Sequence, residues 1–325
     1  MNQWRLSWPF AWGGPVATGR FKTVPEDFEV EEILTEPFSG EGEHLCLWLE
    51  KRGDNTDFIG RQLARCLGVE HMAVSFCGLK DRHAVTRQWF SIQLPGIADD
   101  TALEKLGAEF RILSHTRNRS KLRRGQHWGN RFVIRLREVQ GDRPALETRL
   151  NILAEKGGPN YFGPQRFGHG GGNLREAEAL DPRKLRGRNV RAGLYLSAAR
   201  SWLFNEVLAA RVEAGTWLNR IEGDPILERP TGPMLGDGGG GASGPLAETE
   251  NSMLAAYPAF DRLFRARRLA PERRDLCVVP RDFDMRWEGD DLILAFSLPA
   301  GSYATSWLGE AVTLISAEPE KAPGQ

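Results

Sequence analysis

Hydrophobic and polar positions alternate over several short stretches in the first third of the chain, and one helical pattern lies among them. Alternation is typical of strands, because successive side chains of a strand face opposite sides of the sheet. Between Asp57 and Leu67, apolar residues instead recur at helical spacing, and Gly68 follows as a stop signal. We predict a helix there, with Thr56 as its cap. The predicted strands of this region cover residues 28–34, 45–49, 72–76 and 90–94.

The rest of the chain mixes the two periodicities. Phe132, Ile134 and Leu136 alternate with polar positions, which predicts a strand with three arginines on its opposite face (Arg131, Arg135 and Arg137). Helices are predicted over residues 145–155, 194–213 and 302–315, a strand over 292–298, and a loop over 230–245 with a flexible linker at 238–241. Strands and helices are interspersed without a regular βαβ rhythm, which predicts an α+β or mixed α/β fold.

The composition is typical of a soluble globular protein. Of 325 residues, 41% are hydrophobic and 26% are charged, and this length allows two domains. The Gly-Gly-Pro break at 157–159 is a candidate boundary, and the second crossing is placed near Pro280. Apolar runs stay below the ~18 residues needed to cross a bilayer, and the N-terminal pattern is not that of a secretory signal. We expect a cytoplasmic protein without a membrane segment.

Cysteine and histidine spacing gives little support for a metal site. The four cysteines lie far apart without a CxxC pair, and the six histidines form no HExxH motif. Free thiols in a reducing compartment are the expected state. The glycine-rich stretch at 168–173 lacks the spacing of a phosphate-binding loop, so a nucleotide hydrolase is disfavoured.

Charge is segregated along the chain although the formal net charge is zero. Nine acidic residues and no lysine or arginine lie between Glu26 and Glu50, whereas nine lysines and arginines and no acid lie between Phe110 and Arg137. Local charge governs the field that a polyanion meets, so we predict RNA binding through the basic stretch rather than a merely solvated basic face. The expected RNA-backbone contacts are Arg117, Arg119, Lys121, Arg123 and Arg124, and a second group that could extend the surface is Arg183, Lys184, Arg186, Arg188 and Arg191.

Asp81 is the first candidate for chemistry. It lies between Lys80 and Arg82 on a polar turn that separates two predicted strands. Nearby positive charge keeps a carboxylate ionised, as a nucleophile or general base requires. From spacing alone, a structural aspartate that caps the turn is the plainer interpretation.

Five segments of the chain resemble one protein family. The segment GLKDRHAVTRQWFS at 78–91 resembles the motif that carries the catalytic aspartate of TruD pseudouridine synthases. Four other matches follow the family order and cover nearly the whole chain: FKTVPEDFEVEE at 21–32, GNRF at 129–132, NYFGPQRFG at 160–168 and PAGSYAT at 299–305. The chain is therefore identified as a member of that family.

The resemblance implies a tRNA pseudouridine synthase that needs no metal or organic cofactor. Its expected substrate is uridine 13 in the D arm, where the N1–C1′ bond breaks and the base is rejoined through C5. Asp81 would be the nucleophile on a flipped-out uridine, and attack at C1′, attack at C6 and a glycal intermediate all stay open. The implied architecture is a catalytic domain with a curved mixed sheet at 1–155 and 281–325, interrupted by a TruD insertion domain at 156–280.

Three residues are expected to bind the base. Phe28 matches a site position of the family, where its ring would stack or pack, although a strand-core role fits equally. Tyr303 would stack on uracil, and the Asn130 amide could read its edge or simply form a turn. We expect Phe28, Asn130 and Tyr303 to converge on Asp81.

Two further residues complete the predicted substrate-binding set. Phe132 shares the parity of Ile134 and is better explained as core. Lys22 could pair with Asp81 or be solvated. Two rival classes remain, namely an RNA-binding protein without chemistry and a hydrolase that uses Asp81 with His83. We expect tRNA as the partner and a monomeric enzyme.

Overall fold

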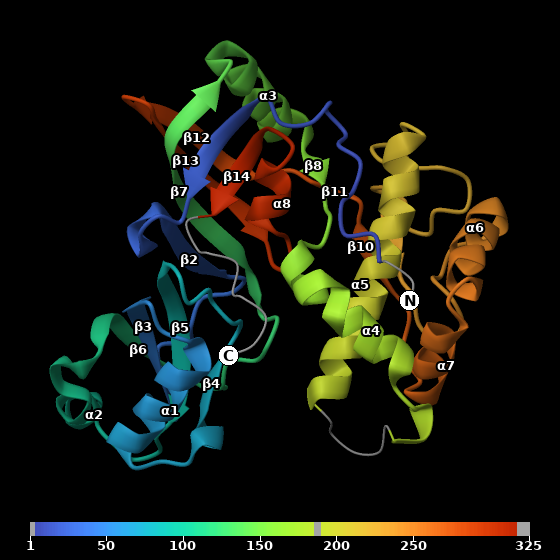
Figure 1. The fold of residues 1–325 in the computed structure, drawn as a ribbon. Helices are drawn as coiled ribbons and strands as arrows, with labels where there is room; N and C mark the ends of the chain where they lie inside the picture. The colour runs from blue at the N-terminus through green and yellow to red at the C-terminus, as the bar shows by residue number, and fades with distance from the viewer. Residues whose placement is uncertain (1–3, 185–189, 317–325) are drawn as a thin grey trace. The chain divides into compact units, whose positions relative to one another are not determined.

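The structure is a computed structural model that describes residues 4–184 and 190–316. The chain packs as two compact units, which are described separately (Figure 1). The first unit contains Met1–Val16, Pro144–Val279 and Ser302–Val312, and the second contains Ala17–Arg143, Pro280–Gly301 and Thr313–Gln325. The expected division near residues 155 and 280 differs from these packing units, and the assignment of catalytic and insertion domains stays a prediction.

One mixed sheet forms the second unit. Its strands are β1 (Ala17–Phe21), β2 (Phe28–Leu34), β3 (His44–Arg52), β4 (Val74–Phe76), β5 (Val85–Gln93), β6 (Arg111–Asn118), β7 (His127–Gly141), β12 (Arg281–Glu288), β13 (Asp291–Pro299) and β14 (Val312–Ser316). The main path runs β12-β13-β7-β2-β5-β3-β6, while β1 pairs with β7 and β14, and β4 pairs with β5. β2 and β5 are parallel, whereas β2 and β7 are antiparallel. The predicted mixed α+β fold is confirmed.

Helices cover one face of β3, β4 and β5. Ile59, Leu63 and Leu67 of α1 (Thr56–Leu67) are buried in one cluster with Leu47 and Phe90, and α2 (Asp99–Leu106) joins the same cluster. The predicted helix is therefore present, and Gly68 ends it with φ 68°. Its cap differs from the expectation, because Asn55 Oδ1 accepts the Asp57 N–H at 2.8 Å. Thr56 is instead the first helical residue, and its hydroxyl is used elsewhere.

The opposite face of the sheet carries paired charges. Arg87 of β5 contacts Glu29 and Glu31 of β2 and Glu50 of β3, with nitrogen–oxygen distances of 2.8–3.5 Å. Arg131 of β7 reaches Glu31 at 3.7 Å. This arrangement follows from strand parity, because residues 29, 31, 87 and 131 all have the parity opposite to the apolar positions. The arginines predicted on the outer face of β7 do lie there.

The first unit is mainly helical. Its elements are α3 (Arg143–Lys156), α4 (Gly172–Ala179), α5 (Val190–Glu213), α6 (Gly244–Ala255), α7 (Pro258–Ala266), α8 (Ala304–Leu308), β8 (Gly158–Pro159), β9 (Thr231–Met234), β10 (Glu272–Asp275) and β11 (Cys277–Val278). α4, α6, α7 and β9 all pack against α5, whose Trp202, Leu203 and Phe204 are buried. A helix covered on several sides is apolar around most of its surface.

Short 3-10 turns complete the described elements. They are η1 (Pro25–Asp27), η2 (His71–Ala73), η3 (Gly107–Glu109), η4 (Pro164–Phe167), η5 (His169–Gly171) and η6 (Pro182–Lys184). η2 replaces the first part of the strand expected over 72–76, so β4 is only three residues long. Within the described residues, no helix combines the length and hydrophobicity needed to span a membrane.

Two expectations for local structure are wrong. The segment 302–315 is not one helix, because α8 stops at Leu308 and β14 begins at Val312 to pair with β1. The segment 230–245 contains β9, which pairs with β10. Its glycines form a hydrogen-bonded turn rather than a flexible linker. Gly236 forms a β-bridge with Gly239, and the Gly240 carbonyl accepts a hydrogen bond from Arg273 Nη1 at 3.0 Å. Long-range pairing decided both cases, and local composition does not encode it.

Candidate active site

Asp81 lies in the loop between β4 and β5, and both of its carboxylate oxygens are engaged. Oδ1 accepts the backbone N–H of His83 at 3.0 Å. Oδ2 accepts a hydrogen bond from Lys22 Nζ, which follows β1 in the chain. The Asp81 side chain is still 37% exposed, so a ligand can reach it. The predicted Lys22–Asp81 pair is present in the structure.

Lys22 is held by aromatic rings as well as by charge. Its ammonium lies 4.3 Å from the centroid of the Phe28 ring and 5.2 Å from that of Phe21. The Lys22 side chain is only 16% exposed, and its backbone has the left-handed φ of 57°. Cation–π contacts of this kind attract the ammonium group to the ring face. The lysine is thus placed between a ring and a carboxylate.

The charge state of Asp81 reflects two opposed effects. Burial on its own raises the pKa of the carboxyl, because a buried carboxylate loses hydration. The charge and hydrogen bond of Lys22, the His83 N–H and the His83 charge act in the other direction, and they set the pKa of Asp81 below its usual range. Asp81 is therefore ionised at neutral pH.

Buried polar groups that the sequence analysis did not assign hold the Asp81 loop. Lys51 Nζ donates to the Asp81 carbonyl at 3.2 Å and to the Asp54 carbonyl at 2.7 Å. The Thr56 hydroxyl accepts the Lys80 N–H at 3.0 Å, and Gln88 Nε2 donates to the Gly78 carbonyl at 3.1 Å. The sequence pattern does indicate the inward position of two of these residues. Lys51 and Gln88 share the parity of the buried apolar positions in their strands.

A buried ion pair between Lys80 and Glu32 also holds the Asp81 loop in place. Lys80 Nζ donates to Glu32 Oε1 at 2.7 Å, and both side chains are almost fully buried. Glu32, Cys77 and His127 bring atoms of metal-ligand type within 4.8 Å of one another. Burial raises the pKa of Cys77 to about 12, so its thiol stays protonated. Because the Lys80 ammonium already supplies the cation beside Glu32, we assign this cluster a supporting role.

Phe28, Phe132 and Asn130 share one face of the sheet. The Phe28 and Phe132 rings lie 5.9 Å apart, and both residues are buried, which agrees with the core role considered for each. Phe28 also contacts Lys22, so it joins the core to the site. Asn130 is two residues from Phe132 on β7 and opposite Glu32 of β2. Its Oδ1 is buried without a hydrogen-bond partner in the part of the chain that the structure describes.

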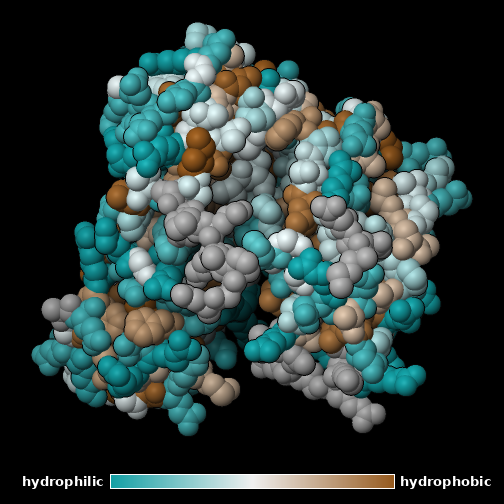
Figure 2. Space-filling view, in the orientation of Figure 1, coloured by the Kyte–Doolittle hydropathy of each residue, from teal (hydrophilic) through white to brown (hydrophobic). Residues whose placement is uncertain are grey.

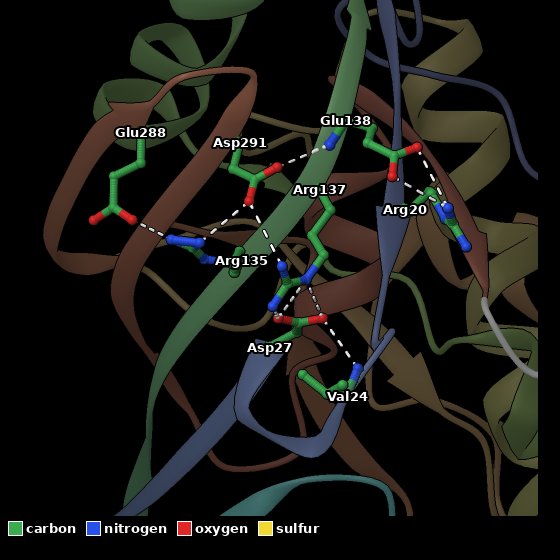
Figure 3. A network of polar contacts seen from close by, with 8 residues as sticks. All are labelled: Arg20, Val24, Asp27, Arg135, Arg137, Glu138, Glu288 and Asp291. Carbon is green, nitrogen blue, oxygen red and sulfur yellow. Dashed lines mark hydrogen bonds and ion pairs between the residues drawn. The ribbon is translucent and has the colours of Figure 1, made fainter.

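Figure 3 shows how the segment between Lys22 and Phe28 is anchored. Asp27 is buried, and its two oxygens accept hydrogen bonds from Nε and Nη2 of Arg137 at 2.7–2.9 Å. Asp27 Oδ2 also accepts the Val24 N–H at 3.1 Å. Asp291 lies beside the pair and contacts Arg135 and Arg137 at 3.1 and 3.8 Å. The turn that follows Lys22 is therefore fixed to β7.

Comparison with known proteins decides the family. Residues 9–176 match the model of the family described as tRNA pseudouridine synthase D (TruD). A Marinobacter nauticus protein named tRNA pseudouridine synthase D is 46% identical over 95% of each chain, and one from Pseudomonas putida is 43% identical over 99% of each. The chain belongs to the TruD family. A solved Methanosarcina mazei chain assigned to the same family superposes with a TM-score of 0.67 at 25% identity, covering 93% of this chain and 95% of that one.

The predicted family and enzyme class are thereby confirmed. TruD enzymes isomerise uridine to pseudouridine in tRNA. The family match covers the segments that carry Lys22, Phe28, Asp81, Asn130 and Phe132. The individual roles of these residues stay predictions.

Tyr303 lies in the first unit of this TruD chain, at the start of α8. Its ring lies 5.9 Å from that of Phe162 in an edge arrangement. Asp81 belongs to the second unit. The expected convergence of Tyr303 on Asp81 therefore stays a prediction.

Four of the nine basic residues between Phe110 and Arg137 pair with acidic residues of the stretch between Glu26 and Glu50. Arg111 contacts Glu50, Arg119 contacts Glu41, Arg131 contacts Glu31 and Arg137 contacts Asp27. The segregated charges of the sequence thus neutralise one another in part, through contacts within the sheet unit. Charge alone therefore argues for RNA binding less strongly than the sequence analysis assumed.

The five residues predicted to contact RNA differ in how exposed they are and in whether protein acceptors already bind them. Arg117 is 15% exposed, and its guanidinium donates to Asp99 and to the carbonyls of Glu43, Leu94 and Ile97. Arg124 is 55% exposed and reaches Asp57 at 3.5 Å. Lys121 and Arg123 are exposed and have no ion pair with the residues described. Of the possible second group, Arg186 and Arg188 lie outside the described residues.

Proposed function

We propose that this chain isomerises uridine to pseudouridine at position 13 of tRNA, with Asp81 as the nucleophile. The observation that carries the proposal is the ionised and partly exposed carboxylate of Asp81, held by Lys22 beside the Phe28 ring. A nucleophile must be in its reactive charge state and within reach of the substrate. Asp81 meets both requirements in a chain of the TruD family.

The reaction has a closed balance of atoms and electrons. The N1–C1′ bond breaks, the C5–C1′ bond forms, a proton leaves C5 and a proton is added at N1. Asp81 acts on the flipped-out uridine and leaves again as a carboxylate when C5 is joined to the sugar. A carboxylate offers about four lone-pair directions. Because Lys22 and the His83 N–H use one direction on each oxygen, others stay open for the sugar.

Asn130 is proposed to read the base. Its Oδ1 is a buried acceptor without a donor in the described part of the chain, and uracil carries an N–H donor at N3. Buried polar groups are nearly always hydrogen-bonded, so an incoming N–H would satisfy this atom. Phe28 and Phe132 are proposed to form the apolar wall beside it, and Tyr303 to stack on the base.

Lys121, Arg123 and Arg124 are proposed to contact the phosphates of the bound tRNA. Their side chains are exposed and close in sequence, on the loop between β6 and β7. Arg119 is exposed as well, although it is paired with Glu41. We leave Arg117 out, because its guanidinium already donates to protein acceptors.

The enzyme is further proposed to act as a cytoplasmic monomer without a metal or organic cofactor. The isomerisation transfers no net electrons, so its balance requires no redox partner. Unchanged turnover after dialysis against a chelator and a monomer mass in light scattering would support this part. Loss of turnover that a divalent ion restores would contradict it.

Release of tritium from tRNA labelled at uracil C5 tests the whole proposal. The wild type should release tritium from tRNA that carries uridine 13, and replacing that uridine by cytidine should abolish release. Asp81→Asn should bind the tRNA and release nothing. Asp100→Asn is the matched control, since Asp100 is an exposed carboxylate on α2.

The two rival functions give different results in the same assay. A protein that only binds RNA would leave the label in place in the wild type. A hydrolase based on Asp81 and His83 would set free uracil or cut the chain rather than yield pseudouridine. Full turnover by Asp81→Asn would overturn the assignment of the nucleophile and leave the family membership intact.

A further inference from the structure

Leu79 is a large apolar side chain that is 61% exposed. It lies in the loop between β4 and β5 that carries Asp81, called here the catalytic loop (residues 77–84). Its neighbours in the chain behave differently, because Lys80 is buried and Gly78 is partly buried. On the face drawn in Figure 2, hydrophobic residues form small separate patches among polar ones. A single exposed leucine is common in proteins and carries no argument by itself. Two further observations give Leu79 a role.

The first observation is that the backbone around Leu79 is fixed on both sides. Four of its polar groups bond to residues outside the loop, and Gly78 is packed so closely that a Cβ there would lie 3.2 Å from the His127 ring. The four bonds are Gly125 N–H to Cys77 O at 2.9 Å, Gln88 Nε2 to Gly78 O at 3.1 Å, Lys80 N–H to Thr56 Oγ1 at 3.0 Å, and Lys51 Nζ to Asp81 O at 3.2 Å. Leu79 is thus presented to solvent by a rigid backbone.

The second observation is the positive charge beside the loop. The bond from Gly125 to Cys77 brings the turn that carries Lys121, Arg123 and Arg124 alongside it. The Arg124 guanidinium lies 4.0 Å from the centroid of the Phe76 ring, three residues before Leu79. Exposed basic groups attract a phosphate backbone. Leu79 is therefore exposed on a loop that neighbours these basic side chains.

We infer that Leu79 enters the base stack of the tRNA and fills the gap left by the flipped-out uridine. A base that leaves its stack exposes the apolar faces of its neighbours, and inserted apolar side chains cover such faces in other protein–nucleic acid complexes. Leu79 and Asp81 are two residues apart, at most about 7 Å between their Cα atoms. The same loop thus carries the wedge and the nucleophile. Because this role presupposes isomerisation of tRNA uridine, it rests on the proposed function.

The test compares two tRNA transcripts labelled at uracil C5. One is intact, and in the other the base stacked next to the target uridine is replaced by an abasic site, so that less stacking opposes flipping. Leu79→Ala should lower kcat/KM on the intact transcript about tenfold or more, because the variant no longer offsets part of the cost of unstacking. On the abasic transcript the loss should shrink to less than about threefold. Leu79→Met, which keeps an apolar side chain of similar length, should retain most of the activity on both.

Met72→Ala is the matched control, since Met72 is 84% exposed in η2 and does not belong to the catalytic loop. A second measurement uses 2-aminopurine placed beside the target uridine and protein carrying Asp81→Asn. Binding should raise its fluorescence, and adding Leu79→Ala should reduce the rise. Unchanged kcat/KM for Leu79→Ala on intact tRNA, or an equal loss on both transcripts, would overturn the inference. An inactive wild type would instead overturn the proposed function.

Discussion

Arg137 donates hydrogen bonds from two of its nitrogens to the buried carboxylate of Asp27 at 2.7–2.9 Å. Asp27 follows Lys22 by five residues in the chain. Asp27 in turn accepts the Val24 N–H and closes the η1 turn. The pair therefore links β7 to the turn that follows Lys22 (Figure 3). Lys22 in turn donates a hydrogen bond to Asp81. We therefore expect Arg137 to influence Asp81 through the position of Lys22, although Arg137 is distant from both in sequence.

Arg137→Met should impair both stability and turnover. It leaves the Asp27 carboxylate buried without its charged partner, and an unsatisfied buried group of this kind costs about 1–3 kcal/mol. The freed η1 turn should also misplace Lys22 and lower kcat more than tRNA affinity. Denaturant unfolding and tritium release measure the two effects.

Arg135→Met is the matched control for this prediction, two residues away on β7. Arg135 pairs with Asp291 and Glu288 at the same face, and its link to Arg137 is indirect, because Asp291 lies 3.8 Å from Arg137. Equal losses of kcat in the two variants would show that Arg137 serves β7 in general and does not position Lys22.

Lys22→Met should shift the acid limb of the pH profile upward. Lys22 stabilises the ionised form of Asp81 and sets its pKa below the usual range. Removing this positive charge favours the protonated form, so the pKa rises and kcat/KM begins to fall at a higher pH than in the wild type. Single-turnover tritium release between about pH 3.5 and 7 spans the ordinary aspartate range. A lower rate with an unmoved acid limb would limit Lys22 to geometry.

Lys51→Met should change how stability depends on pH. Burial lowers the pKa of Lys51 to about 8, while the charges of Asp54 and Asp81 oppose this only in part. Between about pH 8 and 10.5 the unfolded chain then binds more protons at this residue than the folded chain, so folding gains free energy as the pH rises. Relative to Lys51→Met, the wild type should gain roughly 1–3 kcal/mol across this window. Urea unfolding at several pH values measures it, and a constant difference would contradict the assigned pKa.

Strand parity allowed much of the second unit to be predicted from the sequence. Phe132, Ile134 and Leu136 are buried as their alternation indicates, and Arg131, Arg135 and Arg137 face the other way. The same rule, applied to the polar residues Lys51 and Gln88, would have placed them under the Asp81 loop. Buried lysine and glutamine are rare, however, so a polar residue at an inward position is not ordinarily expected to be buried.

Long-range pairing explains what the sequence could not reveal. The residues of β14 can form a strand only because β1 lies beside them, so a local pattern misassigned them to a helix. In the same way, part of the acidic stretch neutralises part of the basic stretch because β2 pairs with β7, and β3 with β6, in one sheet. Linear charge patterning contains no information about which strands will be adjacent.

The basic surface should therefore be smaller than nine residues and should centre on Lys121 and Arg123. Replacing both by glutamine should weaken tRNA binding at low salt, and the slope of log affinity against log salt should fall by about 1 for each phosphate that is no longer neutralised. Arg111→Gln removes the same charge from a 71% exposed side chain that is paired with Glu50 at 2.6 Å, so it should leave the slope nearly unchanged. Filter binding at several salt concentrations measures all three proteins. If Arg111→Gln lowers the slope as much per residue as the double variant, the whole basic stretch, paired or not, faces the RNA.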